Sequence, residues 1–362
     1  MKLTHLLTCL LLCVMGMSCI QDEALNAEAD ILTFTLPGGE EDILDIDYEN
    51  DQIVIWATPG INLESIAPQF TLTEGATISP ESGTVRDFST PKSYEVTAQD
   101  GNWKKTYEIS FIIADIPTKF DFENVRQKDK YQVFYEVNDE NKPCMTWASG
   151  NPGFALTGVG KAPEDYPTMS DSNGISGKCL KLTTRSTGFF GEGVGMPIAA
   201  GNLFLGSFDT SNALTNALKA TRFGFPFAYE PTRLKGYYKY KAGNVFMDGK
   251  VPVPGKKDQC DIYAIFYETD DNLKRLDGTN QFTHPNLVSV ARITDPVETD
   301  EWLEFDIPFV MKPNKTIDNN KLKNKKYNVA IVFSSSLEGD HFKGAVGSTL
   351  YIDNVELEYK AN

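Results

Sequence analysis

Acidic side chains in a glycine-rich turn are the first residues of this sequence that could do chemistry. Hydrolysis of a glycosidic bond needs two carboxyl groups about 5–10 Å apart, one of them protonated near neutral pH. Glu192 lies between Gly191 and Gly193, beside Phe189 and Phe190, so it could project into a cleft. Because the chain contains 50 acidic residues, some pair would fit this spacing by chance, and the catalytic residues stay open. Possible partners for Glu192 are Asp209, Glu230, Asp261 and Glu268.

Aromatic side chains around a long loop could instead bind a sugar without cleaving it. An aromatic ring stacks on the apolar C–H face of a pyranose, while amide and carboxylate groups bond the hydroxyls. Residues 149–177 are rich in Gly and Pro, and a loop longer than ~15 residues in a compact domain is usually functional or disordered. The alternative for each ring is a place in the core. The candidate ligand-binding residues are Trp147, Phe154, Tyr166, Phe189, Phe190 and Trp302.

Three further carboxylates could hold a structural calcium ion. Ca²⁺ prefers six to eight oxygen ligands from carboxylates and backbone carbonyls. If the first and last strands of the second domain pair, Asp121 or Glu123 would lie near Asp353. The alternative is that these residues only cap strand ends. We expect no other cofactor.

Composition and missing motifs disfavour several classes of function. The sequence has no GxSxG, P-loop or HExxH motif, and its three histidines nearly exclude a His-rich metal site. The formal net charge of −16 makes nucleic acid an improbable partner, because an acidic surface repels phosphate backbones. A strongly anionic glycan would be repelled too unless the fold created a local basic patch, so we expect a neutral or weakly charged glycan.

The N-terminus has the pattern of a secretion signal. Lys2 precedes an apolar stretch, 6–14, that is too short to span a bilayer, so residues 1–18 are expected to be a signal peptide. The end of this segment, Met17-Ser18-Cys19, resembles a bacterial lipobox. The resemblance implies lipidation of Cys19 and anchoring to the outer membrane through the lipid alone. The alternative is an ordinary cysteine near a cleavage site. Residues 19–29 are polar and predict a tether.

Three cysteines remain beyond the anchor, and they predict no disulfide framework. Cys144, Cys179 and Cys260 are odd in number and form no CxxC motif. Cys179 and Cys260 fall in strand-like runs, which is typical of buried small hydrophobic residues. Pairing of any two of the three stays open.

The elements that must position these residues are β-strands. From Ile31 the pattern has a period of two, and the Asp100-Gly101 pair between alternating runs predicts a hairpin. About seven short strands in residues 30–115 indicate an Ig-like β-sandwich. A linker with Pro117 follows, and residues 119–362 read as mostly antiparallel strands, which favours a larger jelly-roll-like sandwich. One helix is expected over 211–220.

Strand phase in the second domain can be predicted in detail at two places. Between 301 and 309, Leu303, Phe305 and Ile307 share the face opposite Trp302. Near the C-terminus the alternation of apolar residues shifts by one position, from Leu350 and Ile352 to Val355 and Leu357. A bulge at Asp353-Asn354 would let both pairs face the same side of the sheet. The predicted fold class is therefore all-β, with two sandwiches in series.

Several segments resemble known families of Bacteroidetes surface lipoproteins. The runs 75–83 and 96–101 are similar to the Ig-like spacer modules of those proteins. The runs 151–158, 199–206 and 223–238 occur in the order found in the putative carbohydrate metabolism domain, and the resemblance covers roughly 118–360. It implies a jelly-roll-type sandwich associated with glycan use, and it suggests other surface glycan-uptake proteins as partners.

Three functions compete on this sequence. The first is a surface lipoprotein that binds a poly- or oligosaccharide through the second domain. The second is a glycoside hydrolase or related carbohydrate-active enzyme. The third is an adhesion or surface-assembly component that contacts protein. Because the chain carries no specific catalytic signature, binding without hydrolysis is the favoured interpretation, and Glu192 keeps the enzyme open.

Overall fold

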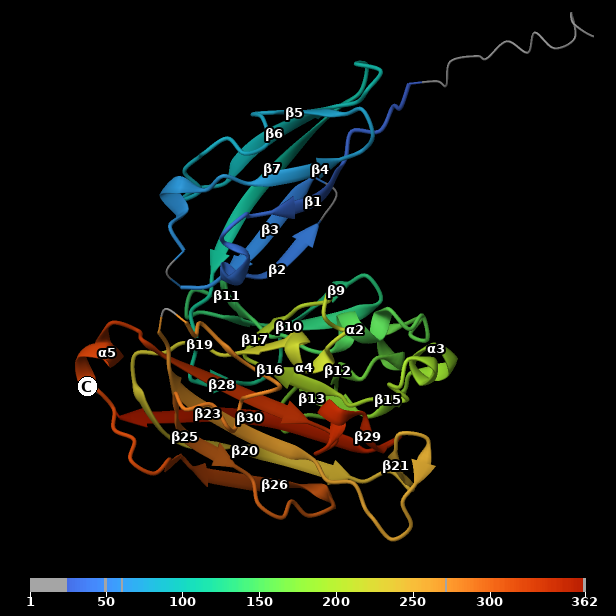
Figure 1. Cartoon of the computed structure of the whole chain (residues 1–362), viewed down its shortest axis with the longest axis vertical. Helices are drawn as coiled ribbons and strands as arrows, with labels where there is room; N and C mark the ends of the chain where they lie inside the picture. The colour runs from blue at the N-terminus through green and yellow to red at the C-terminus, as the bar shows by residue number, and fades with distance from the viewer. Residues whose placement is uncertain (1–24, 49–50, 60, 271, 361–362) are drawn as a thin grey trace, which may run out of the picture.

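Two β-sandwiches are stacked along the long axis of the molecule (Figure 1). The computed structural model describes residues 25–48, 51–59, 61–270 and 272–360. The predicted fold class, an Ig-like sandwich followed by a larger jelly-roll-like sandwich, is confirmed. The predicted signal peptide, Cys19 and the first part of the tether lie outside the described residues. Among the residues described, no helix is both long and apolar enough to cross a membrane.

The first sandwich is built from alternating strands around one apolar core. Its larger sheet has the order β2-β3-β7-β6-β5, and β1 pairs with β4 to form the second layer. The hairpin predicted at Asp100-Gly101 joins β6 to β7, and Gly101 takes a φ of +73°, which suits glycine. Apolar side chains on alternate positions, such as Tyr94 and Val96, face the core. The strands are β1 (Ile31–Thr35), β2 (Ile43–Tyr48), β3 (Gln52–Ala57), β4 (Gln69–Leu72), β5 (Thr77–Ser79), β6 (Lys92–Thr97) and β7 (Lys104–Ile113).

The second sandwich packs two antiparallel sheets face to face. One sheet has the order β12-β13-β30-β20-β26 and the other has the order β16-β28-β23-β25-β27. Leu234 and Ile352 from the first sheet, and Ile262 and Phe333 from the second, are fully buried in the shared core. Its strands are β12 (Thr168–Asp171), β13 (Cys179–Thr183), β16 (Asn202–Phe204), β20 (Glu230–Lys241), β23 (Asp261–Glu268), β25 (Leu287–Arg292), β26 (Thr299–Pro308), β27 (Val310–Met311), β28 (Tyr327–Ser334) and β30 (Thr349–Lys360).

The predicted bulge lies where the sequence placed it. Lys235 pairs with Glu356 and Tyr237 with Asp353, so Gly236 alone faces the two residues between them on β30. Asn354 has a φ of +48°. The bulge lets Leu350 and Ile352 share the core face with Val355 and Leu357, as the phase slip requires.

Two sequence expectations differ from the structure. In β26, Phe305 and Ile307 face the core as expected, but Leu303 is exposed, as is most of the first half of the strand. The helix expected over 211–220 is reduced to α4 (Ala217–Ala220). The Asp209 carboxylate accepts hydrogen bonds from Ser211 and Asn212 and pairs with Arg222, which folds 209–215 into turns rather than a helix.

Charged and aromatic side chains join the two sandwiches. Arg126, on β9 (Val125–Lys128) of the second sandwich, lies 2.9 Å from Asp45 and 2.7 Å from Asp47 of the first. Its guanidinium also lies 4.7 Å from the ring of Trp56. Trp56 belongs to the same buried cluster as the core of the second sandwich. The interface therefore combines ion pairs with apolar packing.

Cys144, Cys179 and Cys260 are free and buried. Burial raises the pKa of Cys144 to about 11 and that of Cys179 to about 12. Because the thiolate is the reactive form, these side chains act as small apolar core residues.

Candidate functional site

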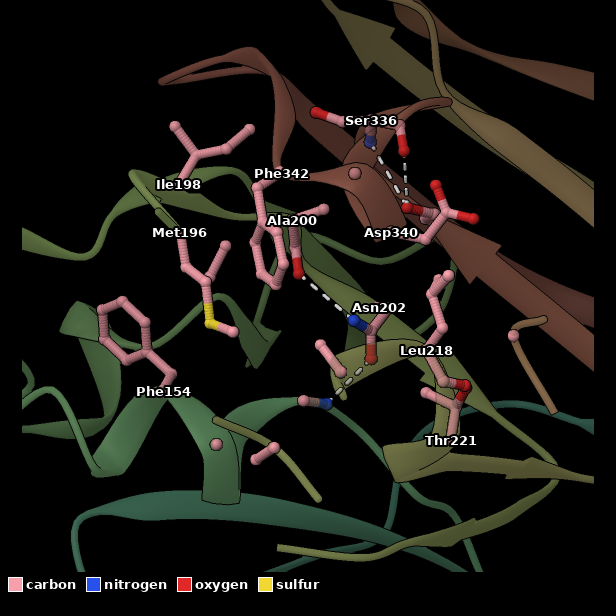
Figure 2. Close-up of a pocket in the computed structure, with 18 of the residues that line it drawn as sticks. Phe154, Met196, Ile198, Ala200, Asn202, Leu218, Thr221, Ser336, Asp340 and Phe342 are labelled. Carbon is pink, nitrogen blue, oxygen red and sulfur yellow. Dashed lines mark hydrogen bonds between the residues drawn. The ribbon is translucent and has the colours of Figure 1, made fainter. Parts of the chain in front are cut away.

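A pocket of about 200 Å³ opens at one side of the second sandwich (Figure 2). It lies beside β16, β23 and β28, and loops and short helices build the rest of its wall. These are α2 (Asn151–Ala155), α3 (Gly188–Gly193), residues 196–200, α4 with the turns before it, the hairpin of β17 (Gly206–Phe208) and β18 (Thr221–Phe223), and η4 (Gly339–His341).

Most of the pocket wall is apolar. Phe154, Met196 and Ile198 come from one side, and Figure 2 shows Phe342 projecting between them and Leu218 on the other side. The ring of Phe190 on α3 lies at the rim, with 44% of the residue exposed, and exposed Leu214 also lines the pocket. Exposed apolar groups around a hollow are a signature of a ligand site.

Charged and amide groups gather at one end of this pocket. Both carboxylate oxygens of Asp261 accept hydrogen bonds from Arg292, at 3.0 and 2.7 Å. Asp340 and Gln281 line the same end. This end continues into a shallow cleft whose wall includes Phe282 and also His341. A ligand would therefore meet apolar surface along its body and hydrogen-bonding groups at one end.

The carboxyl groups of Asp261 and Asp340 differ in their surroundings. Burial raises the pKa of Asp261, and the Arg292 guanidinium opposes that shift. Loss of hydration in the concave wall raises the pKa of Asp340, while His341 and Arg292 lower it. Since 42% of the Asp340 side chain is exposed, solvent screens these effects and the group is held less tightly than Asp261.

Asn202 connects the loop around α2 to the strand that carries the pocket floor. Its side-chain oxygen accepts a hydrogen bond from the backbone N–H of Gly150 at 2.8 Å, and its amide nitrogen donates to the carbonyl of Ala200 at 3.3 Å (Figure 2). Asn202 is at the start of β16, which pairs with β28. The wall that carries Phe154 is thereby fixed to the sheet.

The structure brings together only part of the predicted ligand-binding set. Phe154 and Phe190 line the pocket. Phe189, on the same helix as Phe190, is 93% exposed but does not line it. Trp302 lies half-buried on β26, in the other sheet.

Trp147 and Tyr166 are core residues rather than exposed platforms. Trp147 is 3% exposed, and its ring contacts those of Phe120 and Phe122 at centroid distances of 5.1 and 5.8 Å. Its indole N–H donates to Glu136 at 2.8 Å, which satisfies the one polar group of the side chain. Tyr166 is buried, and its ring lies 5.4 Å from that of Phe154. Tyr166 thus supports the pocket wall from behind.

Glu192 does not occupy the position that the sequence suggested. It is exposed at the end of α3 and does not line the pocket, although Phe190, Gly191 and Val194 do. Asp340, which the sequence did not single out, lines the pocket. No local signal marks Asp340, because it reaches the pocket only through the pairing of β28 with distant strands.

Two of the three carboxylates considered for calcium, Asp353 and Glu123, accept hydrogen bonds from one loop, residues 173–178. Asp353 is buried and accepts hydrogen bonds from the backbone N–H groups of Ile175, at 2.6 Å, and Asn354, at 2.8 Å. Glu123 accepts from the N–H of Lys178, and Asp121 accepts from the N–H of Glu123. Across the part of the chain that the structure describes, no group of three or more His, Cys, Asp or Glu could hold a metal ion. Calcium at these residues stays a prediction.

Family models match both sandwiches. Residues 121–358 match the family described as "Putative carbohydrate metabolism domain", and residues 31–110 match the family described as "SGBP, N-terminal". The first match covers more than half of the chain, so the protein belongs to the carbohydrate metabolism domain family. The family resemblance stated from the sequence is confirmed.

Two solved structures are similar to this chain. One, from Bacteroides thetaiotaomicron VPI-5482, is 58% identical, covers 94% of this chain and all of its own length, and has a TM-score of 0.79. The other, from Bacteroides vulgatus ATCC 8482, is 50% identical, covers 68% of this chain and 100% of its own, and has a TM-score of 0.65. Both are described as putative glycoside hydrolases. None of the curated proteins matches this chain.

Proposed function

We propose that the second sandwich binds an oligosaccharide in the pocket of Figure 2. The observation that carries this proposal is the division of the pocket into an apolar wall, with Phe190 at its rim, and a polar end formed by Asp261, Arg292 and Asp340. A pyranose ring also has apolar surface, on its C–H faces, and polar groups, its hydroxyls, so each part of the sugar has a matching part of the pocket. Membership of the carbohydrate metabolism domain family supports this choice of ligand.

Binding is expected to be weak. Stacking on a single exposed ring and a few hydrogen bonds give modest gains, which the ordering of the ligand offsets. We expect dissociation constants on the order of micromolar to millimolar.

Neighbouring phenylalanines allow a matched test. A panel of oligosaccharides identifies the ligand, and calorimetric titration then compares Phe190→Ala with Phe189→Ala. We expect Phe190→Ala to weaken binding about tenfold, equivalent to ~1.4 kcal/mol, because the ring lines the pocket. Phe189→Ala, which removes a more exposed ring that does not line it, should bind like the wild type. Equal effects of the two changes would rule out this pocket as the site.

Hydrolysis is a second candidate function. Asp340 has a raised pKa, as a general acid requires, and Asp261 provides another carboxylate at the same end of the pocket. The ion pair with Arg292 commits Asp261 to structure, which is why binding alone is preferred. Release of reducing ends from the bound glycan that Asp340→Asn abolishes would establish the enzyme. If the wild type binds the glycan and releases none, binding alone stands.

Lipidation of Cys19 and exposure at the cell surface complete the proposal. The match of residues 31–110 to the SGBP N-terminal family supports a surface glycan-binding role in a Bacteroidetes-type organism. Mass spectrometry of the mature N-terminus should find diacylglycerol on Cys19, and Cys19→Ala should release the protein from the membrane fraction. A Cys19→Ala protein that still sediments with membrane would contradict the anchor.

A further inference from the structure

A second hollow, of about 680 Å³, lies on the outer face of the sheet β12-β13-β30-β20-β26. Two of these strands, β20 and β26, lie at the lower edge of the second sandwich in Figure 1. The hollow is distinct from the pocket of Figure 2, since the two share no lining residue. We call it the basic groove. It is lined by Asn173, Lys181, Thr183, Arg185, Lys239, Tyr240, Lys241, Thr299, Asp300, Gly347, Thr349 and Tyr351.

Strand register places lysines and aromatic rings alternately across the groove. Lys181 on β13 pairs with Tyr351 on β30, and Tyr351 pairs with Lys239 on β20. Both ammonium groups lie 5.4 Å from the Tyr351 ring, and Lys239 also lies 4.4 Å from the ring of Trp302 on β26. Each strand of the row contributes one ammonium group or one aromatic ring. Neighbouring strands are about 4.8 Å apart, so these groups follow one another at that spacing across the sheet. Trp302, predicted from the sequence as a ligand platform, stands at the end of this row, beside the groove rather than in its lining.

The charge of the groove is opposite to that of the chain. Its lining has four basic residues and one acidic residue, Asp300, in a protein whose formal net charge is −16. Lys181 is paired with Asp171 at 3.2 Å. Among the described residues, no carboxylate lies within ion-pair distance of Lys239 or Lys241. The positive charge of Lys239 and Lys241 is therefore not neutralised by an ion pair, whereas that of Lys181 is.

The opposite end of the same sheet face is organised differently. On the same strand, Lys235 pairs with Glu358 at 2.6 Å and Arg233 pairs with Asp306 at 2.5 Å. These cations are neutralised by acids on the neighbouring strands β30 and β26. Lys239 and Lys241 occupy equivalent outward positions of β20 and face Tyr351, Thr349 and Trp302 instead. The unpaired charge therefore belongs to the groove and not to the whole sheet.

From these observations we infer that the basic groove binds an acidic saccharide, one that carries carboxylate or sulfate groups on its sugar rings. The ammonium groups supply charge-assisted hydrogen bonds to the anionic substituents, while Tyr351 and Trp302 offer faces for the C–H surface of the sugar. Thr183, Thr349 and Asn173 add hydrogen-bonding groups for hydroxyls. The local basic patch removes the reason for expecting only neutral glycans. This inference does not depend on the function proposed for the other pocket.

The test compares two probes of identical backbone with the intact protein. Tetragalacturonate carries free carboxylates, and its methyl ester carries none. We expect the wild type to bind tetragalacturonate and not the ester, with affinity falling as NaCl rises from about 50 mM to about 500 mM, since salt screens these contacts. Sulfated and unsulfated dextran oligosaccharides repeat the comparison for sulfate. Binding of either anionic probe supports the inference and identifies the anion.

Matched variants locate the binding. The double change Lys239→Gln and Lys241→Gln should lower affinity for the anionic probe at least about tenfold. Lys235→Gln, on the same strand but ion-paired, should lower it by less than about twofold. Trp302→Ala should also weaken binding. Thermal melts verify that all variants are folded, and Phe190→Ala should leave this binding unchanged because Phe190 lines the other pocket.

Specific results would overturn the inference. Equal binding of tetragalacturonate and its ester would remove the role of charge. Equal losses from Lys235→Gln and the double variant would indicate non-specific attraction. Tighter binding of a single-stranded oligonucleotide than of any anionic saccharide would make the groove a phosphate-polymer site. Because Phe190→Ala and the Lys239→Gln, Lys241→Gln double variant report on separate hollows, failure of this inference and failure of the proposed function are distinguishable.

Discussion

Glu136 carries a carboxyl group into the core of the second sandwich, on β10 (Tyr131–Val137). Burial raises its pKa to about 8, the hydrogen bond from Trp147 opposes the shift, and the charge of Asp121 adds to it. The carboxyl group is therefore mostly protonated in the folded protein at neutral pH. In the unfolded chain the carboxyl group ionises near its ordinary pKa of 4.5. Between pH 4.5 and pH 8 the folded state therefore binds more protons than the unfolded state.

Stability should consequently fall as pH rises from about 4.5 to about 8. The loss from this one group is on the order of 4 kcal/mol over that range. Glu136→Gln should flatten the dependence, because the amide oxygen can still accept from Trp147 and the side chain no longer ionises. Denaturant unfolding at several pH values measures this. Glu140→Gln, an exposed change on the loop after the same strand, is the control and should keep the wild-type slope.

Asp353 differs from Glu136 in that both of its oxygens accept backbone hydrogen bonds. Burial raises its pKa, the bond from Ile175 lowers it, and the nearby charge of Glu123 raises it. Asp353→Asn would turn an NH₂ group toward one of the N–H donors. We expect a loss of about 1–3 kcal/mol in unfolding free energy.

The same variant tests the calcium prediction. If calcium binds beside Asp353, CaCl₂ should raise the melting temperature of the wild type, EDTA should reverse the rise, and Asp353→Asn should not respond. A wild-type melting temperature that is the same in CaCl₂ and in EDTA would leave Asp353 with the capping role alone.

The burial of individual side chains was the hardest feature to predict from the sequence. Trp147 and Trp302 are both tryptophans near strand-like runs, yet one is buried and the other lies half-buried on an outer face. Sequence alternation indicates which residues of one strand share a face, but it does not say which face another layer will cover. Trp302 could be placed outward because three apolar neighbours lay in the opposite phase. Trp147 had no such pattern around it.

At the scale of elements, local signals were sufficient where the structure itself is local. The hairpin at Asp100-Gly101 and the bulge at Asp353-Asn354 follow from turn chemistry and the period of two. The pocket follows from neither. Its walls come from segments near 154, 190, 218, 261 and 340, which only long-range strand pairing brings together. For the same reason the sequence located part of the pocket, through Phe154 and Phe190, and missed Asp340.

The β17–β18 hairpin, which carries Phe208 and Phe223 into the pocket wall, depends on the glycine at its start. Gly206 has a φ of +149°, and a Cβ there would lie 2.0 Å from the carbonyl oxygen of Arg222. The obstacle is backbone of the paired strand and cannot rotate away. Gly206→Ala should destabilise the protein by about 1–3 kcal/mol and weaken ligand binding in the pocket.

Gly249→Ala separates the cost of the positive φ from the cost of the close contact that an added Cβ makes. Gly249 also has a positive φ, +61°, but no atom lies within 4 Å of the Cβ position. It should therefore cost only the backbone strain of about 1 kcal/mol and leave binding unchanged. Similar results for both variants would show that the close contact at Gly206 is unimportant.

At the scale of the whole molecule, Arg126 is the residue that couples the sandwiches most directly. It contacts two carboxylates and an indole of the first sandwich. Arg126→Gln should weaken the interface by about 1–3 kcal/mol and separate the unfolding of the two units in calorimetry. Lys119→Gln removes an exposed ion pair beside the linker and should not. One unchanged transition in Arg126→Gln would place the coupling elsewhere.

Independent folding of the second sandwich remains a prediction. Its apolar core is far larger than its contact with the first unit, so a fragment of residues 120–362 should be soluble and unfold cooperatively. Circular dichroism melts of the fragment measure this. A fragment that aggregates or melts without cooperativity unless residues 30–114 are present would contradict the prediction.

The connection between the sandwiches has almost no slack. The N–H of Ala114 bonds to Ala57 of the first unit at 2.8 Å, and that of Asp115 bonds to Cys144 of the second at 2.7 Å. Together with the Arg126 contacts, these bonds restrict bending and twisting at the joint, so we expect the two sandwiches to move as one body. A polymer pulling on the second sandwich would turn the whole body about the base of the first. The first sandwich would then change its orientation with the direction of the pull. In a pair of domains joined by a free hinge, only the second domain would turn.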